Sequence, residues 1–125
     1  MSTDRVYNLI LITNILRVLE EKGMTKAELA EKAGVSGSFF IELSNNKANP
    51  SLRIIAAIAD ALELPLPMLL DDSDVSKEVL KAITNQGVFK FPGDLVWQGG
   101  VLNKYQAFQV LKWSDDNKKL LKRNK

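Results

Sequence analysis

Residues 24–36, with the sequence MTKAELAEKAGVS, decide how this chain folds. Thr25 and Glu28 stand three residues apart, the spacing of a capping box in which each side chain bonds the backbone amide of the other residue. The helix predicted from this box ends at Gly34, because glycine adopts the left-handed backbone of a sharp turn without strain. Ser36 can then cap a further helix. The stretch therefore predicts two short helices joined by a tight turn.

Helices are also predicted on both sides of this pair. Residues 6–22 contain no glycine or proline and carry apolar side chains at helical spacing, which predicts one amphipathic helix. A third helix is expected over about residues 37–45, followed by a polar loop and a fourth helix that Ser51 caps. Pro65 and Pro67 limit a fifth helix to its first turn. The apolar stripe expected on the fourth helix consists of Leu52, Ile55, Ile58, Ala59 and Leu62.

Two short helices with a tight turn between them, packed by helices before and after, make a helix-turn-helix. This arrangement places its second helix in the major groove of DNA, so the third predicted helix must project far enough to enter a groove about 12 Å wide. The preceding helix can pack closely against its neighbours because small residues form its expected buried side and the turn that follows it. These small residues are Ala27, Ala30, Ala33 and Gly34.

The same residues resemble a known family, the lambda-repressor-like helix-turn-helix regulators of the Cro/C1 or XRE type. The resemblance rests on residues 24–36, 46–52 and 58–62 and covers roughly residues 9–70. It implies a mainly α protein whose first 70 residues form a five-helix DNA-binding domain.

The resemblance also implies which residues contact DNA. The family places its base readers at the start and in the middle of the third helix, here Gly37, Ser38, Phe39 and Glu42. Contacts to the phosphate backbone are expected from Lys26, Ser36, Asn45, Lys47 and Arg53.

The base readers have specific chemistry. Arginine often stands in the family at the positions of Gly37 and Glu42, so the strong arginine–guanine contact is absent. Ser38 can donate or accept a hydrogen bond, Phe39 can contact a thymine methyl group, and Glu42 can accept from the amino group of cytosine. Gly37 could instead let the helix backbone lie deep in the groove. Two alternatives stay open: Phe39 covers the loop between the third and fourth helices, or Glu42 is a solvated charge that repels phosphate.

Composition excludes other functions. The 125 residues include no cysteine and no histidine, which removes disulfides, thiolate nucleophiles, the commonest general base and the commonest zinc ligand. The sequence shows no glycine-rich phosphate loop and no metal-ligand spacing, so we expect no enzyme, cofactor or metal. The chain has neither the ~20 apolar residues of a membrane span nor the pattern of a signal peptide, so we expect a cytoplasmic protein without membrane contact.

Net charge alone says little about nucleic-acid binding. Residues 1–70 hold seven basic and eight acidic side chains, a net charge of −1, whereas residues 71–125 hold ten and seven, a net charge of +3. DNA binding must therefore depend on where the charges lie.

The sequence after residue 70 predicts a separate segment. An acidic stretch at residues 71–74 marks a change in composition, so residues 71–87 are expected to be a linker with a short helix over about 75–84. Residues 88–125 should form a C-terminal segment, with a strand near residues 95–102 and then a helix from Lys104 to about Leu121.

The C-terminal segment carries a second resemblance. Residues 101–113, followed by Asp115, Lys118 and Lys119, are similar to the C-terminal segment of the plasmid regulators KorA and TrbA. In those regulators a strand and a helix pair two protomers and cooperate with a ParB-like global repressor of the KorB type. Together with the helix-turn-helix, this implies a repressor of plasmid transfer or maintenance genes, similar to the TrbA type.

The length and composition of the tail also favour a homodimer. A strand and one helix of about 35 residues bury too little surface to fold alone. An unpaired apolar strand is also a template for pairing with another copy. The alternative is that the tail folds back as additional core of the first domain. The expected dimer interface consists of Val96, Trp97, Val101, Tyr105, Phe108, Leu111 and Trp113.

The function predicted from the sequence is a dimeric repressor that binds a palindromic operator in double-stranded DNA. The alternative is an antitoxin-like or co-repressor module whose tail binds a protein partner.

Overall fold

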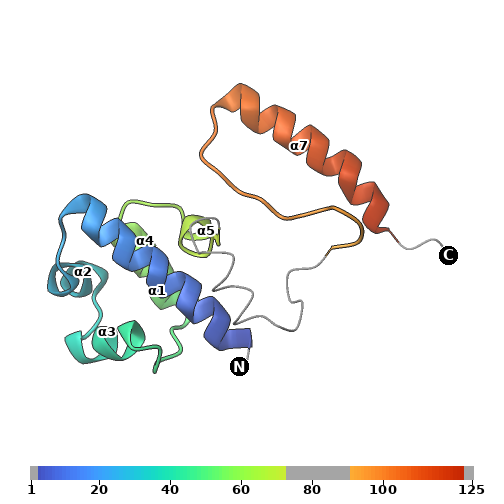
Figure 1. Ribbon diagram of the computed structural model, residues 1–125. Helices are drawn as coiled ribbons and strands as arrows, with labels where there is room; N and C mark the ends of the chain where they lie inside the picture. Colours follow the sequence, from blue (N-terminus) through green and yellow to red (C-terminus); the bar gives the residue numbers. More distant parts are fainter. Residues whose placement is uncertain (1–2, 73–90, 123–125) are drawn as a thin grey trace. The chain divides into compact units, whose positions relative to one another are not determined.

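A computed structural model describes residues 3–72 and 91–122 of the chain (Figure 1). The chain divides into two compact units, Met1–Gln86 and Gly87–Lys125. The short helix predicted over residues 75–84 lies outside the described residues.

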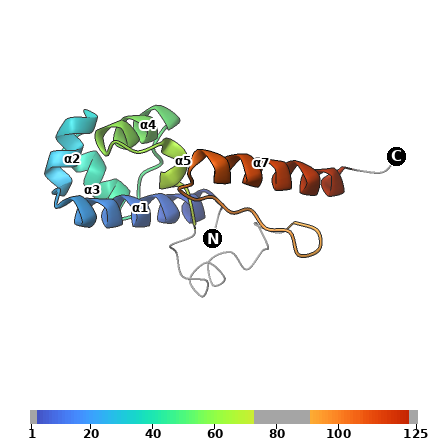
Figure 2. The ribbon, with the colours of Figure 1, turned by 90° about the horizontal axis from the view of Figure 1, so that it is seen from above.

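The first unit contains the five predicted helices: α1 (Thr3–Lys22), α2 (Lys26–Ala33), α3 (Gly37–Ser44), α4 (Leu52–Ala61) and α5 (Leu66–Leu69). α1 packs against α3 and α5, α2 packs against α3 and α4, and α4 packs against α5. Figures 1 and 2 show α2 and α3 together near one end of α1, with α5 toward the other end. The predicted helix-turn-helix is therefore confirmed as α2, a turn and α3.

Local hydrogen bonds begin and end these helices as predicted. The hydroxyl of Thr25 accepts from the backbone amide of Glu28 at 3.1 Å, and the reciprocal bond completes the capping box. Gly34 ends α2 in the left-handed region with φ of 70°. The hydroxyl of Ser36 caps α3 and that of Ser51 caps α4. These caps satisfy amides that a helix cannot bond internally.

The core of the first unit combines side chains from all five helices. Its fully buried side chains include Leu11, Ile15, Leu29, Leu43, Ile58, Leu62 and Leu69. Two predicted core positions are wrong. Leu52 is 69% exposed because it is the first residue of α4, more than a turn before the buried Ile58 and Ala59. Ala27 is exposed because the buried side of α2 is formed by Leu29 and Ala30.

The second unit contains the predicted C-terminal helix. α7 spans Lys104–Lys118 and continues as a 3₁₀ turn, η1, over Lys119–Leu121. The side chain of Asn103 accepts from the backbone amide of Gln106 at 2.8 Å, and the side chain of Gln106 accepts from the backbone amide of Asn103, so a second capping box begins α7.

The strand predicted at residues 95–102 is wrong for this chain. Within the two described ranges no residue is assigned to a strand, and residues 95–102 have no ladder partner. High strand propensity favours an extended backbone, but a strand also needs a neighbouring strand to satisfy its amides and carbonyls.

Among the residues that the structure describes, no helix is long and apolar enough to cross a membrane.

Candidate nucleic-acid interface

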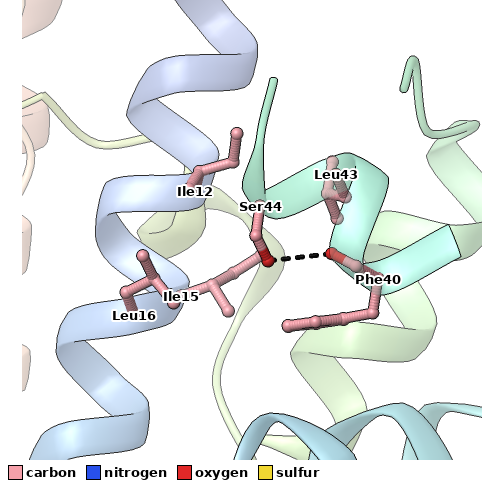
Figure 3. A pocket seen from close by; sticks show the side chains of 6 residues that line it. All are labelled: Ile12, Ile15, Leu16, Phe40, Leu43 and Ser44. Atoms are coloured by element: carbon pink, nitrogen blue, oxygen red, sulfur yellow. Dashed lines mark hydrogen bonds between the residues drawn. The ribbon is translucent and has the colours of Figure 1, made fainter. Parts of the chain in front are cut away.

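One side of α3 packs against α1. Phe40 and Leu43 are 3% and 1% exposed, and with Ser44 they face a shallow apolar pocket that Ile12, Ile15 and Leu16 of α1 complete (Figure 3). The hydroxyl of Ser44 donates to the carbonyl oxygen of Phe40 at 2.8 Å, so its polar group is satisfied within the helix. This side of α3 belongs to the core.

The other side of α3 is a continuous exposed stripe. It consists of Ser38, Ile41, Glu42 and Asn45, which are all exposed and follow the i, i+3, i+4, i+7 spacing of one helix face. Ser38 and Glu42 are predicted base readers, and Asn45 is a predicted phosphate contact. Ile41 is not among the predicted contacts, although this spacing is visible in the sequence.

Gly37 and Phe39, the other two predicted base readers, have different surroundings in the structure. A Cβ atom added at Gly37 would meet nothing within 4 Å, so the packing of the chain does not require glycine there. Phe39 is half-buried and packs against the core. Its packing favours a structural contribution over a fully exposed contact with a base.

Exposed cationic and polar residues precede and follow α3 along the chain. Lys26 is exposed at the first residue of α2, Lys47 is exposed in the α3–α4 loop, and Arg53 is exposed in the first turn of α4. The hydroxyl of Ser36 accepts from the amide of Phe39 at 3.1 Å, which leaves its proton available to donate. These positions place hydrogen-bond donors before and after α3.

Hydrogen bonds hold the loop that carries Lys47 in place. The amide of Lys47 donates to the carbonyl oxygen of Glu42 at 2.8 Å, and Asn46 adopts a left-handed φ of 58°. The side-chain amide of Asn8, on α1, donates to the carbonyl oxygen of Ala48 at 3.2 Å and to Oδ1 of Asn49 at 2.9 Å. Asn8 is a positioning residue that sequence patterns do not reveal, because forty residues separate the partners.

The predicted dimer residues lie in the second unit, and all are exposed in a single copy of the chain. The side chains of α7 include none that is buried. The exposed fractions are 76% for Val96, 75% for Trp97, 85% for Val101, 71% for Tyr105, 64% for Phe108, 64% for Leu111 and 61% for Trp113.

Among the described residues no group of acidic side chains could hold a metal ion.

Comparison with known proteins gives the class. Residues 14–74 match the family model of the Cro/C1-type HTH DNA-binding domain. The chain is 31% identical over 64 residues to the immunity repressor protein of Bacillus phage phi105, covering 51% of this chain and 44% of that protein. It is 30% identical over 79 residues to the antitoxin HipB of Escherichia coli, covering 62% of this chain and 83% of that protein.

A solved structure agrees with the family. A chain of the SinR protein/SinI protein complex is 25% identical to this chain, with a TM-score of 0.53, and the match covers 87% of this chain and 98% of that one. The protein therefore belongs to the Cro/C1-type helix-turn-helix family, a family of DNA-binding transcriptional regulators. It spans about half the length of several curated relatives that it matches.

Proposed function

We propose that this protein is a sequence-specific transcriptional repressor that binds an inverted-repeat operator in double-stranded DNA as a homodimer. The observation that carries the proposal is the exposed stripe of α3, which lies opposite the side packed on α1. A helix held by its apolar side can present the opposite side to base edges in the major groove. Bound protein then prevents transcription by covering the promoter.

Within this proposal, base contacts and phosphate contacts are divided between residue types. Ser38 hydrogen-bonds a base edge, Glu42 accepts from a cytosine amino group, and Gly37 allows the backbone of α3 to approach the groove closely. Phe39 contacts DNA only through the exposed part of its side chain. The phosphates are bound by Lys26, Ser36, Asn45, Lys47 and Arg53, which fix the register of α3 on the duplex.

The homodimer is proposed from the exposed aromatic side chains of the tail. Tyr105, Phe108 and Trp113 are each more than half exposed on one helix in a single copy. Large aromatic side chains contribute most when they are desolvated at an interface. A second copy that covers them would remove this surface from water and would place two reader helices about a common axis.

The proposed genetic role rests on the tail sequence. The similarity of residues 101–113 to KorA and TrbA supports control of plasmid transfer or maintenance genes, and it supports a ParB-like partner of the KorB type.

A protein partner is the second candidate function. The relative HipB is an antitoxin, and a similar chain has been solved in the SinR protein/SinI protein complex. Both observations support a chain that binds another protein, with DNA binding either retained or secondary, and the exposed tail is the surface that we propose for this partner. A toxin gene beside the gene for this protein would favour this candidate.

Selection from random duplex DNA by the full chain tests the proposal. We expect enrichment of an inverted repeat whose half-sites lie about one helical turn, or a multiple of one turn, apart. Footprinting on the recovered site should then show symmetric protection. Recovery of no preferred sequence, or of a single asymmetric half-site, would contradict the proposal.

A further inference from the structure

Ile41 is the apolar member of the exposed stripe on α3. Its side chain is 61% exposed, and it belongs neither to the buried core nor to the lining of the α1–α3 pocket. The folded domain therefore gains little from an isoleucine at this position, and a polar side chain would be tolerated there.

The neighbours of Ile41 on its own stripe are polar. The other members of its stripe are Ser38, Glu42 and Asn45, which are polar and exposed. A single apolar side chain among polar ones does not make the contiguous apolar patch that marks a protein-binding site. It suits a surface on which polar groups alternate with single apolar groups. The major groove is such a surface: its base edges are polar, and its apolar feature is the C5-methyl group of thymine.

Gly37 supplies the space that this contact needs. Side chains on a helix lean toward its N-terminus, so Ile41 leans over the turn that begins at Gly37, four residues earlier. A Cβ atom at Gly37 would have nothing within 4 Å, so the surface beside Ile41 is open. A methyl group can reach the isoleucine side chain from this open side.

We propose that Ile41 determines specificity for a thymine by packing against its C5-methyl group in the major groove. The inference rests on the proposed function, since it requires that α3 enters the groove. It assigns the methyl contact to Ile41 and not to the half-buried Phe39. Ser38 and Glu42, on the same stripe, read the hydrogen-bonding groups of neighbouring base pairs.

Replacement of thymine by deoxyuridine tests the contact, because it removes only the methyl group. The probe is the duplex recovered by selection with the full chain, with each thymine replaced in turn. At one thymine of each half-site the wild-type chain should lose about fourfold in affinity per methyl, the fold-change that corresponds to about 0.8 kcal/mol for one buried methyl group. Ile41→Ala should bind the thymine and deoxyuridine duplexes equally at that position.

Two further variants make the result specific. Ile41→Val keeps a branched apolar side chain and should retain part of the preference for thymine. Leu52→Ala removes an apolar side chain of similar exposure from the start of α4, and should leave the thymine-to-deoxyuridine ratio at the wild-type value. Thermal unfolding of each variant shows whether the fold is intact, which the exposure of Ile41 leads us to expect.

The outcomes separate this inference from the proposed function. If the selected site contains no thymine whose methyl group matters, or if Ile41→Ala keeps the full discrimination, Ile41 does not read thymine while the repressor proposal stands. If no sequence is enriched at all, the repressor proposal fails and the assignment of Ile41 fails with it.

Discussion

The side-chain amide of Asn14 donates a hydrogen bond to the carbonyl oxygen of Leu69 at 2.8 Å, across 55 residues of sequence. The same nitrogen donates to the carbonyl oxygen of Asp71 at 2.8 Å. Asn14 is only 1% exposed and is the buried polar side chain of the described core. These two bonds fasten α5 and the chain that follows it to α1, and they satisfy two carbonyl oxygens where the chain leaves the domain.

Asn14→Leu should destabilise the first unit by about 2–4 kcal/mol, because the substitution leaves these two carbonyl oxygens without their donor. Urea denaturation of the full chain, monitored by the circular dichroism of its helices, measures the change in the free energy of unfolding. Asn8→Ala is the matched control, since its two bonds lie at a more exposed site and should contribute about 1 kcal/mol or less. Equal stability of Asn14→Leu and wild type would show that the two hydrogen bonds of Asn14 do not stabilise the first unit.

Two glycines with open space around them should respond differently to alanine. A Cβ atom at Gly34 or Gly37 meets nothing within 4 Å, but only Gly34 has a positive φ, of 70°. Gly34→Ala should therefore cost about 1–2 kcal/mol through backbone strain alone. Gly37→Ala lies in a helix and should be neutral or slightly stabilising. Thermal or urea unfolding of the pair checks this contrast.

Gly37→Ala should nevertheless weaken DNA binding, if the backbone of α3 approaches the groove as proposed. The affinity of the full chain for its selected duplex measures this effect. A variant that is as stable as wild type and binds equally well would mean that glycine at residue 37 is not needed for close approach.

Lys47→Ala and Glu42→Ala should separate phosphate contacts from base contacts. Phosphate contacts carry no sequence information, so Lys47→Ala should weaken binding to all duplexes and reduce the salt slope by roughly one unit per half-site. Glu42→Ala removes an anion from the groove, so it should preserve or raise non-specific affinity. It should lose about 1–3 kcal/mol of discrimination at one base pair.

Salt titrations and single-base variants of the selected site provide the measurements. The net charge of −1 on residues 1–70 makes the contrast clear, because few cations are present to compensate. A changed sequence preference in Lys47→Ala, together with an unchanged preference in Glu42→Ala, would mean that α3 is oriented differently on the duplex.

A chain that ends near Asp74 should be folded, monomeric and weak on a full inverted repeat. The core described above lies within α1–α5, so the tail is not needed to complete it. In the full chain, Phe108→Ala or Trp113→Ala should loosen the dimer by roughly 2–4 kcal/mol if the ring is buried at the interface. Sedimentation equilibrium measures both; equally tight dimers of the shortened and full chains would place the interface elsewhere.

The sequence by itself determined the helices, their ends and the class of protein. The caps at Thr25, Ser36, Ser51 and Asn103 and the turn at Gly34 all depend on residues three or four positions apart, so local patterns predict them. The same residues carry the resemblance to the Cro/C1 type, which the family match confirms.

Only the tertiary structure decided which side chains are available and which segments are paired. Phe39 and Ile41 are both apolar residues of α3, but packing between distant helices leaves Phe39 half-buried and Ile41 exposed. The predicted strand at residues 95–102 is absent from the described chain because pairing needs a second segment that propensity does not supply. Burial and strand pairing depend on contacts between residues far apart in sequence, whereas helix caps do not.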